Sequence, residues 1–433
     1  MARLSPVSSA PEASVPHREF AWPFWPAAPL YPYGRRRTLR RVVVPDRIWT
    51  FDQYQGIFYV VVPIRMTVVR LNGGGLLVYA PVAPTPECVA LVRDLEQRYG
   101  CVRYILLTTT TGIEHKVFVG PFARRFPQAQ VYVAPHQWSY PLNLPLSWLG
   151  LPHRRTHWLP SDSSQVPFAA EFDYALLGPI ALGLGPFAEV ALFHRESRTL
   201  LLTDSLVSVP ADPPPVLALD PYPLLFHSRD RADDPIHDSP EARRRGWQRI
   251  ALFAFYFRPS ALGVPTLGEA WQEARHAPDR SRRAYFGLYP FRWQPDWQTS
   301  FEALHGEGRP FVAPVLQTLI FNRGPAQVMD WVQQVSRWQF ERVIPCHLTA
   351  PLAITPLEFQ AAFGFLVEGL GDCNLGSNPG PTQVTDLPVH AAGQGSPKYS
   401  PPPLPTADFA FLREIETGLV RRGITPPRRS LEE

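Results

Sequence analysis

Histidine and carboxylate side chains follow three apolar runs of this sequence. Glu114 and His115 end the polar loop after one run, Asp204 ends a second run, and His347 ends a third. Imidazole and carboxylate groups are the ligands that Zn²⁺, Fe and Mn ions accept, three or four to an ion. A water molecule bound to such an ion loses a proton near neutral pH and becomes a nucleophile. Metal-dependent hydrolysis is therefore a chemistry that these residue types could support.

The elements that must position these side chains alternate between strands and helices. In the first half, the sequence predicts strands at 57–69, 76–80, 102–107 and 130–133, with helices near 84–100 and 121–126. In the second half, it predicts strands at 174–177, 189–194, 199–203 and 342–344, with helices at 314–321, 326–338 and 356–370. Two β-layers with accompanying helices predict an α/β four-layer αββα sandwich. Strand ends of both halves then converge on one edge, so residues far apart in the sequence can share a metal.

Composition divides the rest of the chain. Residues 1–45 form an irregular Pro- and Arg-rich N-terminal arm, and residues 46–370 form the folded domain, with a large irregular insertion at about 210–310. Residues 371–433 are a Pro- and Gly-rich linker, expected to be disordered, that ends in a short helix over Phe409–Val420.

Overall composition excludes several classes of protein. With 45% apolar residues the chain can bury a real core, and its 51 prolines argue against a long helical bundle. A net charge of +4 without strong clustering gives no reason to expect a nucleic-acid partner. No apolar run approaches the length of a transmembrane helix, and four scattered cysteines favour a reducing compartment. We expect a cytoplasmic protein, or a plastid one if residues 1–40 act as a transit segment.

The arginine run Arg35–Arg41 allows two interpretations. It could dock on an anionic surface such as a membrane or RNA. A short run of this kind is more often a solvated boundary of the folded body.

In order and spacing, the three strand-end segments resemble the metallo-β-lactamase superfamily. In that superfamily a strand leads into a Thr-His-x-His-x-Asp-His loop, a later strand ends in a metal-bridging Asp, and a late strand ends in Pro-Gly-His. The resemblance implies a metallo-β-lactamase-like fold. It also implies that the second metal site is retained, with four ligands: Glu114, His115, Asp204 and His347.

The same comparison implies a degenerate first metal site. Thr110 and Gly112 stand where two first-metal histidines would be, and the third would lie near Gly185. Glu114 replaces the usual aspartate and is one methylene longer.

A narrower resemblance covers about residues 46–370. The segments Glu114–Val119, Gln137-Trp138, Pro141–Pro145 and Asp220–Pro223 are similar to an uncharacterised domain-of-unknown-function family of photosynthetic organisms. That family is a divergent offshoot of the metallo-β-lactamase fold, and the resemblance implies no particular activity.

Two functions follow as hypotheses. The first is a single-metal hydrolase of unknown substrate that binds one transition metal, Zn or else Fe or Mn, with Lys116 and His136 as accessory site residues. The second is a non-catalytic scaffold, without a metal, that binds a small molecule or a partner protein. A purely structural role for each residue stays open. A lone strand-end histidine is more often a hydrogen-bonded structural residue, and Asp204 could cap a turn. Neither the substrate nor the oligomeric state can be predicted.

Overall fold

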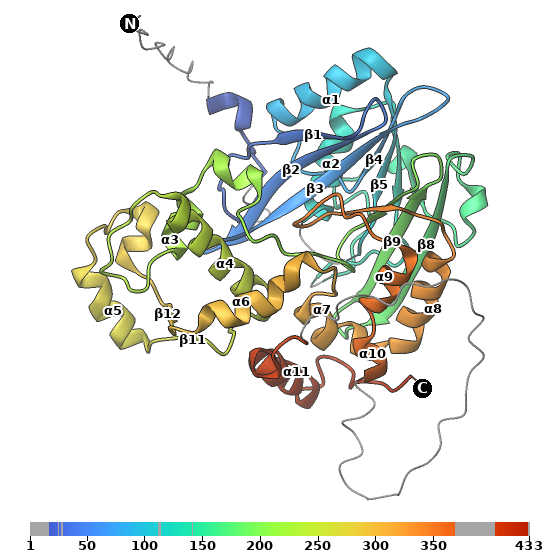
Figure 1. Ribbon diagram of the computed structural model, residues 1–433. Coiled ribbons are helices and arrows are strands. Elements are labelled where there is room, and N and C mark those ends of the chain that lie inside the picture. Colours follow the sequence, from blue (N-terminus) through green and yellow to red (C-terminus); the bar gives the residue numbers. More distant parts are fainter. Residues whose placement is uncertain are drawn as a thin grey trace, which may run out of the picture.

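Two stacked β-sheets form the centre of the computed structural model, which describes residues 17–24, 26, 29–110, 114–140, 142–368 and 403–431 (Figure 1). The first sheet has seven strands in sequential order: β1 Leu39–Val44, β2 Ile48–Ile57, β3 Val60–Arg70, β4 Leu76–Tyr79, β5 Val102–Leu107, β6 Gln130–Val133 and β7 Thr156–Trp158. Strands β1 to β4 pair antiparallel, and β4 to β7 pair parallel.

The second sheet has four strands. Their spatial order is β13 Arg342–Pro345, β10 Thr199–Leu202, β9 Pro186–His194 and β8 Phe172–Ala181. Strands β10 and β13 are parallel, whereas β8, β9 and β10 pair antiparallel. The carboxyl ends of β10 and β13 therefore lie side by side at one edge of this sheet.

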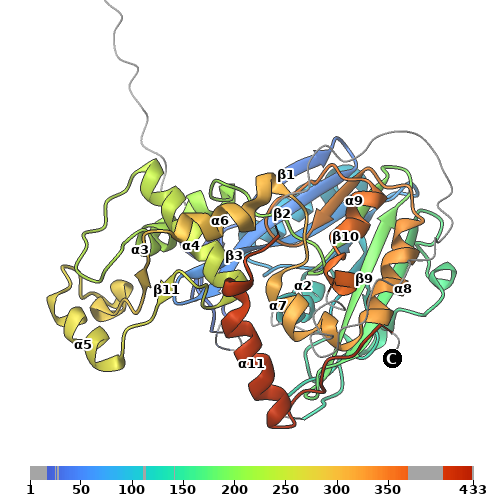
Figure 2. The same ribbon diagram turned by 60° about the horizontal axis from the view of Figure 1, so that its bottom comes forward.

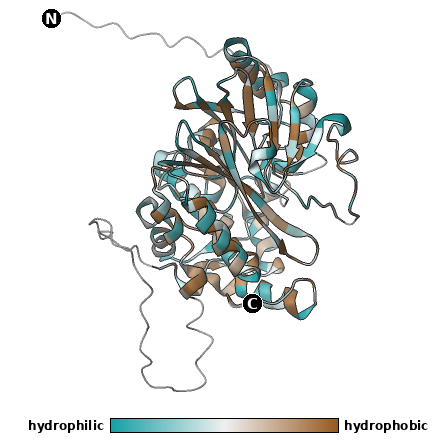
Figure 3. Cartoon of the chain, turned by 90° about the vertical axis from the view of Figure 1, so that its right-hand side faces the viewer, coloured by the Kyte–Doolittle hydropathy of each residue, from teal (hydrophilic) through white to brown (hydrophobic). Residues whose placement is uncertain are grey.

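Helices cover the outer face of each sheet. Helices α1 Pro86–Tyr99 and α2 Lys116–Arg125 pack on the first sheet, and α8 Pro325–Ser336 and α9 Pro356–Ala361 pack on the second. The short helix α10 Phe365–Glu368 follows α9 after a break, so the single helix predicted at 356–370 is two helices. Figure 3 shows the apolar strands in the interior, between more polar helices. This is the predicted αββα order, and the fold class is confirmed.

Period-two alternation along the strands separates the apolar core into layers. Leu76 and Val78 of β4 face the core under α1 and α2, whereas Leu77 and Tyr79 face the core between the sheets. Leu201 of β10 meets the inter-sheet core from the opposite side, and its neighbours in β10 face the core under α8. Side chains of a strand point alternately to its two faces, so each central strand contributes to two cores.

The residues that lie between β10 and α7 Pro314–Leu319 in the sequence form a further unit beside the ends of β2 and β3 (Figure 1). Its elements are α3 Tyr222–His227, α4 Pro240–Tyr256, β11 Leu262–Gly263, α5 Leu267–His276, β12 Arg292–Trp293 and α6 Trp297–His305. Helix α4 packs against β3, and an aromatic core centred on Tyr59, Phe226 and Tyr289 joins the unit to the β2–β3 turn.

The C-terminal segment ends in a helix that packs on the sandwich. Helix α11 Ala410–Arg421 lies against α7, and its Leu412 is buried in the same core as α8 (Figure 2). The short helix predicted at 409–420 is thus present. The disordered linker was expected at 371–405, and its residues 371–402 lie outside the described residues. No helix in the described part of the chain combines the length and apolar character needed to cross a membrane.

The structure differs from the sequence-based expectation at the N-terminal boundary. Residues 39–44 form β1 instead of the end of an irregular arm, and the arginines around this strand are paired. Arg37 binds Glu87, Arg40 binds Asp94, and Arg41 binds Asp52. These arginines attach the first strand to the body.

His227 should make the docking of the insertion sensitive to acid. Its buried Nε2–H donates to the carbonyl of Phe58 at 3.1 Å, and burial lowers the pKa of His227 to about 3. A depressed histidine pKa gives stability that is present above pH 6.5 and is lost as the pH falls below that value. The contribution should fall by about 2 kcal/mol between pH 7 and pH 5.

Urea unfolding of wild type and His227→Gln at the two pH values measures this difference. The variant keeps an N–H donor but does not titrate, so it should lose about 2 kcal/mol less than wild type between pH 7 and pH 5. His276→Gln alters an exposed histidine of α5 and should behave like wild type. Parallel pH curves for wild type and His227→Gln would contradict the assignment.

Candidate metal centre

Strand ends of the two sheets bring the four predicted residues to one rim of the sandwich. Asp204 follows β10 and His347 follows β13, and these parallel strands are in register, with Leu202 opposite Pro345. Glu114 and His115 directly precede α2 and approach the same rim from the first sheet. Residues 111–113 of that loop, including Gly112, lie outside the described residues.

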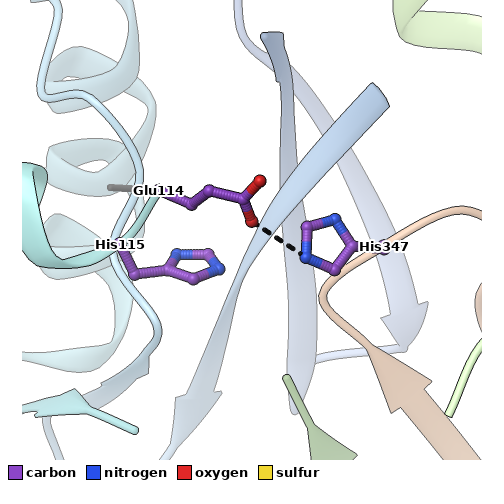
Figure 4. A group of neighbouring side chains, drawn as sticks. All are labelled: Glu114, His115 and His347. Atoms are coloured by element: carbon purple, nitrogen blue, oxygen red, sulfur yellow. Dashed lines mark ion pairs between the residues drawn. The ribbon is translucent and has the colours of Figure 1, made fainter. Parts of the chain in front are cut away.

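Three of the four side chains converge on a common point (Figure 4). The ligand atoms of Glu114, His115 and His347 all lie within 4.8 Å of one another. His347 Nε2 is 3.1 Å from Glu114 Oε2 and 3.0 Å from Asp204 Oδ1. Asp204 therefore contacts the cluster through His347 and is not part of the mutually close set.

His347 is held as an imidazolium in this arrangement. Its Nδ1–H donates to the carbonyl of Pro63 at 2.9 Å, and its Nε2–H lies between the carboxylates of Glu114 and Asp204. A carbonyl and two carboxylates can only accept hydrogen bonds, so both ring nitrogens carry protons. Burial alone would lower the pKa of His347, but the two carboxylates outweigh burial and raise it. Burial alone would raise the pKa of Glu114, but the positive charge of His347 outweighs burial and lowers that pKa.

His115 has the opposite character. Its ring is buried, and its Nδ1–H donates to the carbonyl of Pro81 at 3.1 Å. Burial lowers the pKa of His115, so the ring is neutral and Nε2 carries a lone pair. That Nε2 has no hydrogen-bond donor among the described residues. A buried acceptor without a partner costs free energy, and a cation at this point would supply the missing interaction.

A buried arginine fixes the loop that carries His347. Arg65 of β3 donates from Nη1 to the carbonyl of Pro345 at 2.8 Å and from Nη2 to that of Leu348 at 2.9 Å. Its Nε–H donates to Asp52 at 2.6 Å, and both charged groups are almost fully buried. The first sheet thus holds the backbone on both sides of His347.

A buried carboxylate fixes the loop that carries Asp204. Glu189 of β9 accepts hydrogen bonds from the backbone N–H of Thr203 at 2.7 Å and from that of Ser205 at 3.0 Å. Burial, with a contribution from the charge of Asp204, raises the pKa of Glu189 to about 7. Arg65 and Glu189 are positioning residues that the sequence analysis missed. Both lie inside strands, and the only sequence signal is a charged residue in an otherwise apolar run.

The predicted accessory residues do not reach the cluster. The Lys116 ammonium donates to the carbonyls of Thr110 and Trp138, and burial lowers the pKa of Lys116 to about 8. The ammonium group of Lys116 is therefore held by two backbone carbonyls. His136 is exposed on the loop after β6 and is not among the three converging side chains.

Comparison with known proteins gives a family and a fold likeness. A family model described as a domain of unknown function, DUF4336, matches residues 45–365. No curated protein matches the sequence.

Similar solved structures have low identity to this chain. A metallo-β-lactamase from Pontibacter korlensis is 9% identical, with a TM-score of 0.35, over 76% of this chain and 99% of the other. A metal-soaked flavodiiron core from Synechocystis is 9% identical, with a TM-score of 0.37, over 76% of this chain and 60% of the other. A flavo-di-iron protein variant from Thermotoga maritima is 8% identical, with a TM-score of 0.38, over 77% and 63%. The likeness concerns the fold alone, and the layer order rests on the sheets and helices described above.

Removing Arg65 should destabilise the protein strongly. Arg65→Met leaves Asp52 buried with only its half-exposed partner Arg41 and frees the carbonyls that Arg65 binds. We expect a loss of about 3–5 kcal/mol in the free energy of unfolding, the usual effect of breaking a buried pair. Chemical denaturation measures it. Arg41→Met, which removes the outer partner of the same carboxylate, should cost about 1 kcal/mol or less. Equal losses in the two variants would show that Arg65 is not the anchor.

Proposed function

The chain belongs to the DUF4336 family, and we propose that it is a single-metal hydrolase whose ion is held by Glu114, His115 and His347. The observation that carries the proposal is the buried, neutral His115. Its Nε2 lies beside the two other ligand groups and accepts no hydrogen bond from the described residues. One carboxylate and two imidazoles are a donor set that Zn²⁺, Fe or Mn accepts.

Each residue has a distinct role in this proposal. His115 offers a lone pair without losing a proton, because Pro81 already fixes its tautomer. His347 must give up its Nε2 proton, and the Pro63 carbonyl keeps its ring oriented while it does so. Asp204 orients His347 and is the candidate fourth ligand. When bound, an ion of this class polarises carbonyl or phosphoryl oxygens and lowers the pKa of water.

The rim is open enough for a substrate. The side chains of Glu114, Asp204 and His347 are 29%, 23% and 13% exposed, whereas His115 forms the buried wall behind them. An ester, thioester or phosphoester could therefore approach from the solvent side. The particular substrate is not part of the proposal.

Contacts around Thr110 support one ion instead of two. Thr110, at one of the three positions aligned with first-metal histidines, accepts from the N–H of Ala188 and donates to the carbonyl of Pro186. The indole of Trp138 covers Gly185, where even an added Cβ would lie 2.1 Å from the ring. The Lys116 ammonium binds the carbonyls of Thr110 and Trp138. A ring and a positive charge thus fill the region in which a first cation would be expected.

The alternative is a non-catalytic scaffold, and one observation favours it. The His347 imidazolium already pairs with Glu114 and Asp204, so one positive charge of the protein balances one of the two carboxylate charges at the rim without a metal. In that case the sandwich would serve to bind a small molecule or a partner protein.

We further propose a cytoplasmic location, or a plastid one if residues 1–40 direct the chain there, and a division into an arm, a domain at 46–370 and a C-terminal segment. The link to photosynthetic organisms also stays a prediction.

Metal content separates the two functions. Full-length, tag-free protein expressed with Zn, Fe and Mn supplements should contain about one metal ion per chain by elemental analysis. His347→Ala and His115→Ala should each lower metal affinity by more than about 100-fold, because even outer-shell changes cost 10–100-fold. His194→Ala is the matched control, since His194 is a buried histidine at the end of β9 that binds Ser197.

The same preparations test catalysis. Metal-loaded wild type and His194→Ala should hydrolyse at least one of an activated ester, thioester or phosphoester, and the two ligand variants should not. Protein that remains metal-free after supplementation, while folded by circular dichroism, would refute the hydrolase and leave the scaffold. Metal that survives equally in all variants would refute the assigned ligands.

A further inference from the structure

A cavity of about 910 Å³ has none of the proposed metal ligands in its lining. The cavity is bounded by the N-terminal segment before β1, the distal ends of β2 and β3, and residues 282–286 of the insertion. Ligand pockets in proteins are commonly about 300–1,000 Å³. The cavity therefore has the size of a site for a small organic molecule.

The charge on the cavity wall is strongly positive. Five arginines line it: Arg35, Arg36, Arg37, Arg282 and Arg283. Asp220 is the only lining acid among the described residues, and it already accepts from Tyr31 at 2.5 Å and from Arg283 at 3.3 Å. The wall therefore presents more positive charge than its own carboxylate can balance.

Arg36 is a buried charge that the protein leaves incompletely paired. Its side chain is almost fully buried, and its Nη1 donates to the carbonyl of Tyr54 at 3.2 Å. Its Nε and Nη2 find no hydrogen-bond acceptor in the described part of the chain. Burial lowers the pKa of Arg36 to about 10, which leaves the guanidinium charged at neutral pH. The charge of Glu114 acts on Arg36, and the guanidinium lies over the Phe118 ring at 5.1 Å. Buried N–H groups of a charged side chain without an acceptor are nevertheless costly, so an anion from solution would gain from binding here.

Aromatic side chains form much of the remaining wall. Tyr33 and Phe286 line the cavity and are 46% and 68% exposed. The Phe20 ring also lines it and lies under the Arg37 guanidinium at 4.1 Å. Exposed flat rings beside guanidinium groups suit a planar ligand, because rings stack on each other and on arginine.

We propose that this cavity binds a small oxyanion attached to an aromatic ring, with the anion on Arg36 and the ring against Tyr33 and Phe286. Phosphate, phosphonate and carboxylate groups share the required chemistry, because each accepts two parallel hydrogen bonds from a guanidinium. No cavity-lining residue is a proposed metal ligand, although the charge of Glu114 also acts on Arg36. The proposal does not depend on the proposed hydrolase function.

Calorimetric titration of the full-length, chelator-treated protein with phenylphosphonate tests the site. We expect saturable binding to wild type and binding weaker by about tenfold or more to Arg36→Met, which keeps the aliphatic stem but loses the charge-assisted hydrogen bonds. Arg40→Met is the matched control, because Arg40 binds Asp94 on the outer side of β1 and does not line the cavity. It should bind like wild type.

A surface variant guards against misfolding of Arg36→Met. Arg282 is exposed, so Arg282→Glu should fold normally and weaken binding by a few-fold or more through charge reversal. Methylphosphonate should bind at least tenfold more weakly than phenylphosphonate, and benzyl alcohol should not bind. Equal binding of the two phosphonates would overturn the aromatic part of the proposal.

Two outcomes would overturn the site as a whole. One is the absence of binding at millimolar phenylphosphonate, and the other is equal binding to Arg36→Met, Arg282→Glu and Arg40→Met. His347→Ala should retain wild-type phenylphosphonate affinity, whether or not the protein binds metal. Loss of binding in His347→Ala alone would place the anion at the rim instead of in the cavity.

Discussion

The buried ion pair between Arg65 and Asp52 is the interaction on which the placement of the candidate centre depends. Removing both charges from water is costly, and the cost is offset only because the guanidinium also satisfies the carbonyls of Pro345 and Leu348. Those carbonyls belong to the second sheet, whereas Arg65 and Asp52 belong to the first. His347 therefore takes its position only when the two sheets are stacked, so the centre is a property of the complete sandwich.

Strands with continuous apolar runs could be predicted from the sequence, and strands with buried polar residues could not. The predicted strand at 102–107 has the same bounds as β5, and that at 342–344 is one residue shorter than β13. Residues 48–56 of strand β2 were not predicted as a strand, because Asp52, Gln53 and Gln55 interrupt the apolar pattern in its middle. Asp52 is buried against Arg65, and Gln53 is buried against Thr38 and Ala83. A local pattern contains no information about such partners.

The candidate site shows the same division between local and distant information. Histidines and acids at strand ends can be recognised in the sequence, because the apolar run and its last residue are adjacent. The groups that orient them cannot, because Glu189 acts on backbone N–H groups and Arg65 acts on carbonyls about 280 residues away. The contacts of Lys116 could not be predicted from the sequence either. Neighbours in sequence at the start of a helix point in different directions, and Lys116 turned toward backbone carbonyls.

In the proposed metal centre, a proton and a metal ion would compete for the same place. In the proton-bridged state, the Nε2–H of His347 contacts both Glu114 and Asp204 and balances one of their two negative charges. His115 is the residue that this state leaves unexplained, because its buried lone pair gains nothing from a proton held on His347. A structural role for His115 uses only its Nδ1–H, which donates to the carbonyl of Pro81, and leaves the buried Nε2 unsatisfied. The presence of an imidazole there, with its tautomer fixed by Pro81, is the part of the arrangement that a cation accounts for and a proton does not.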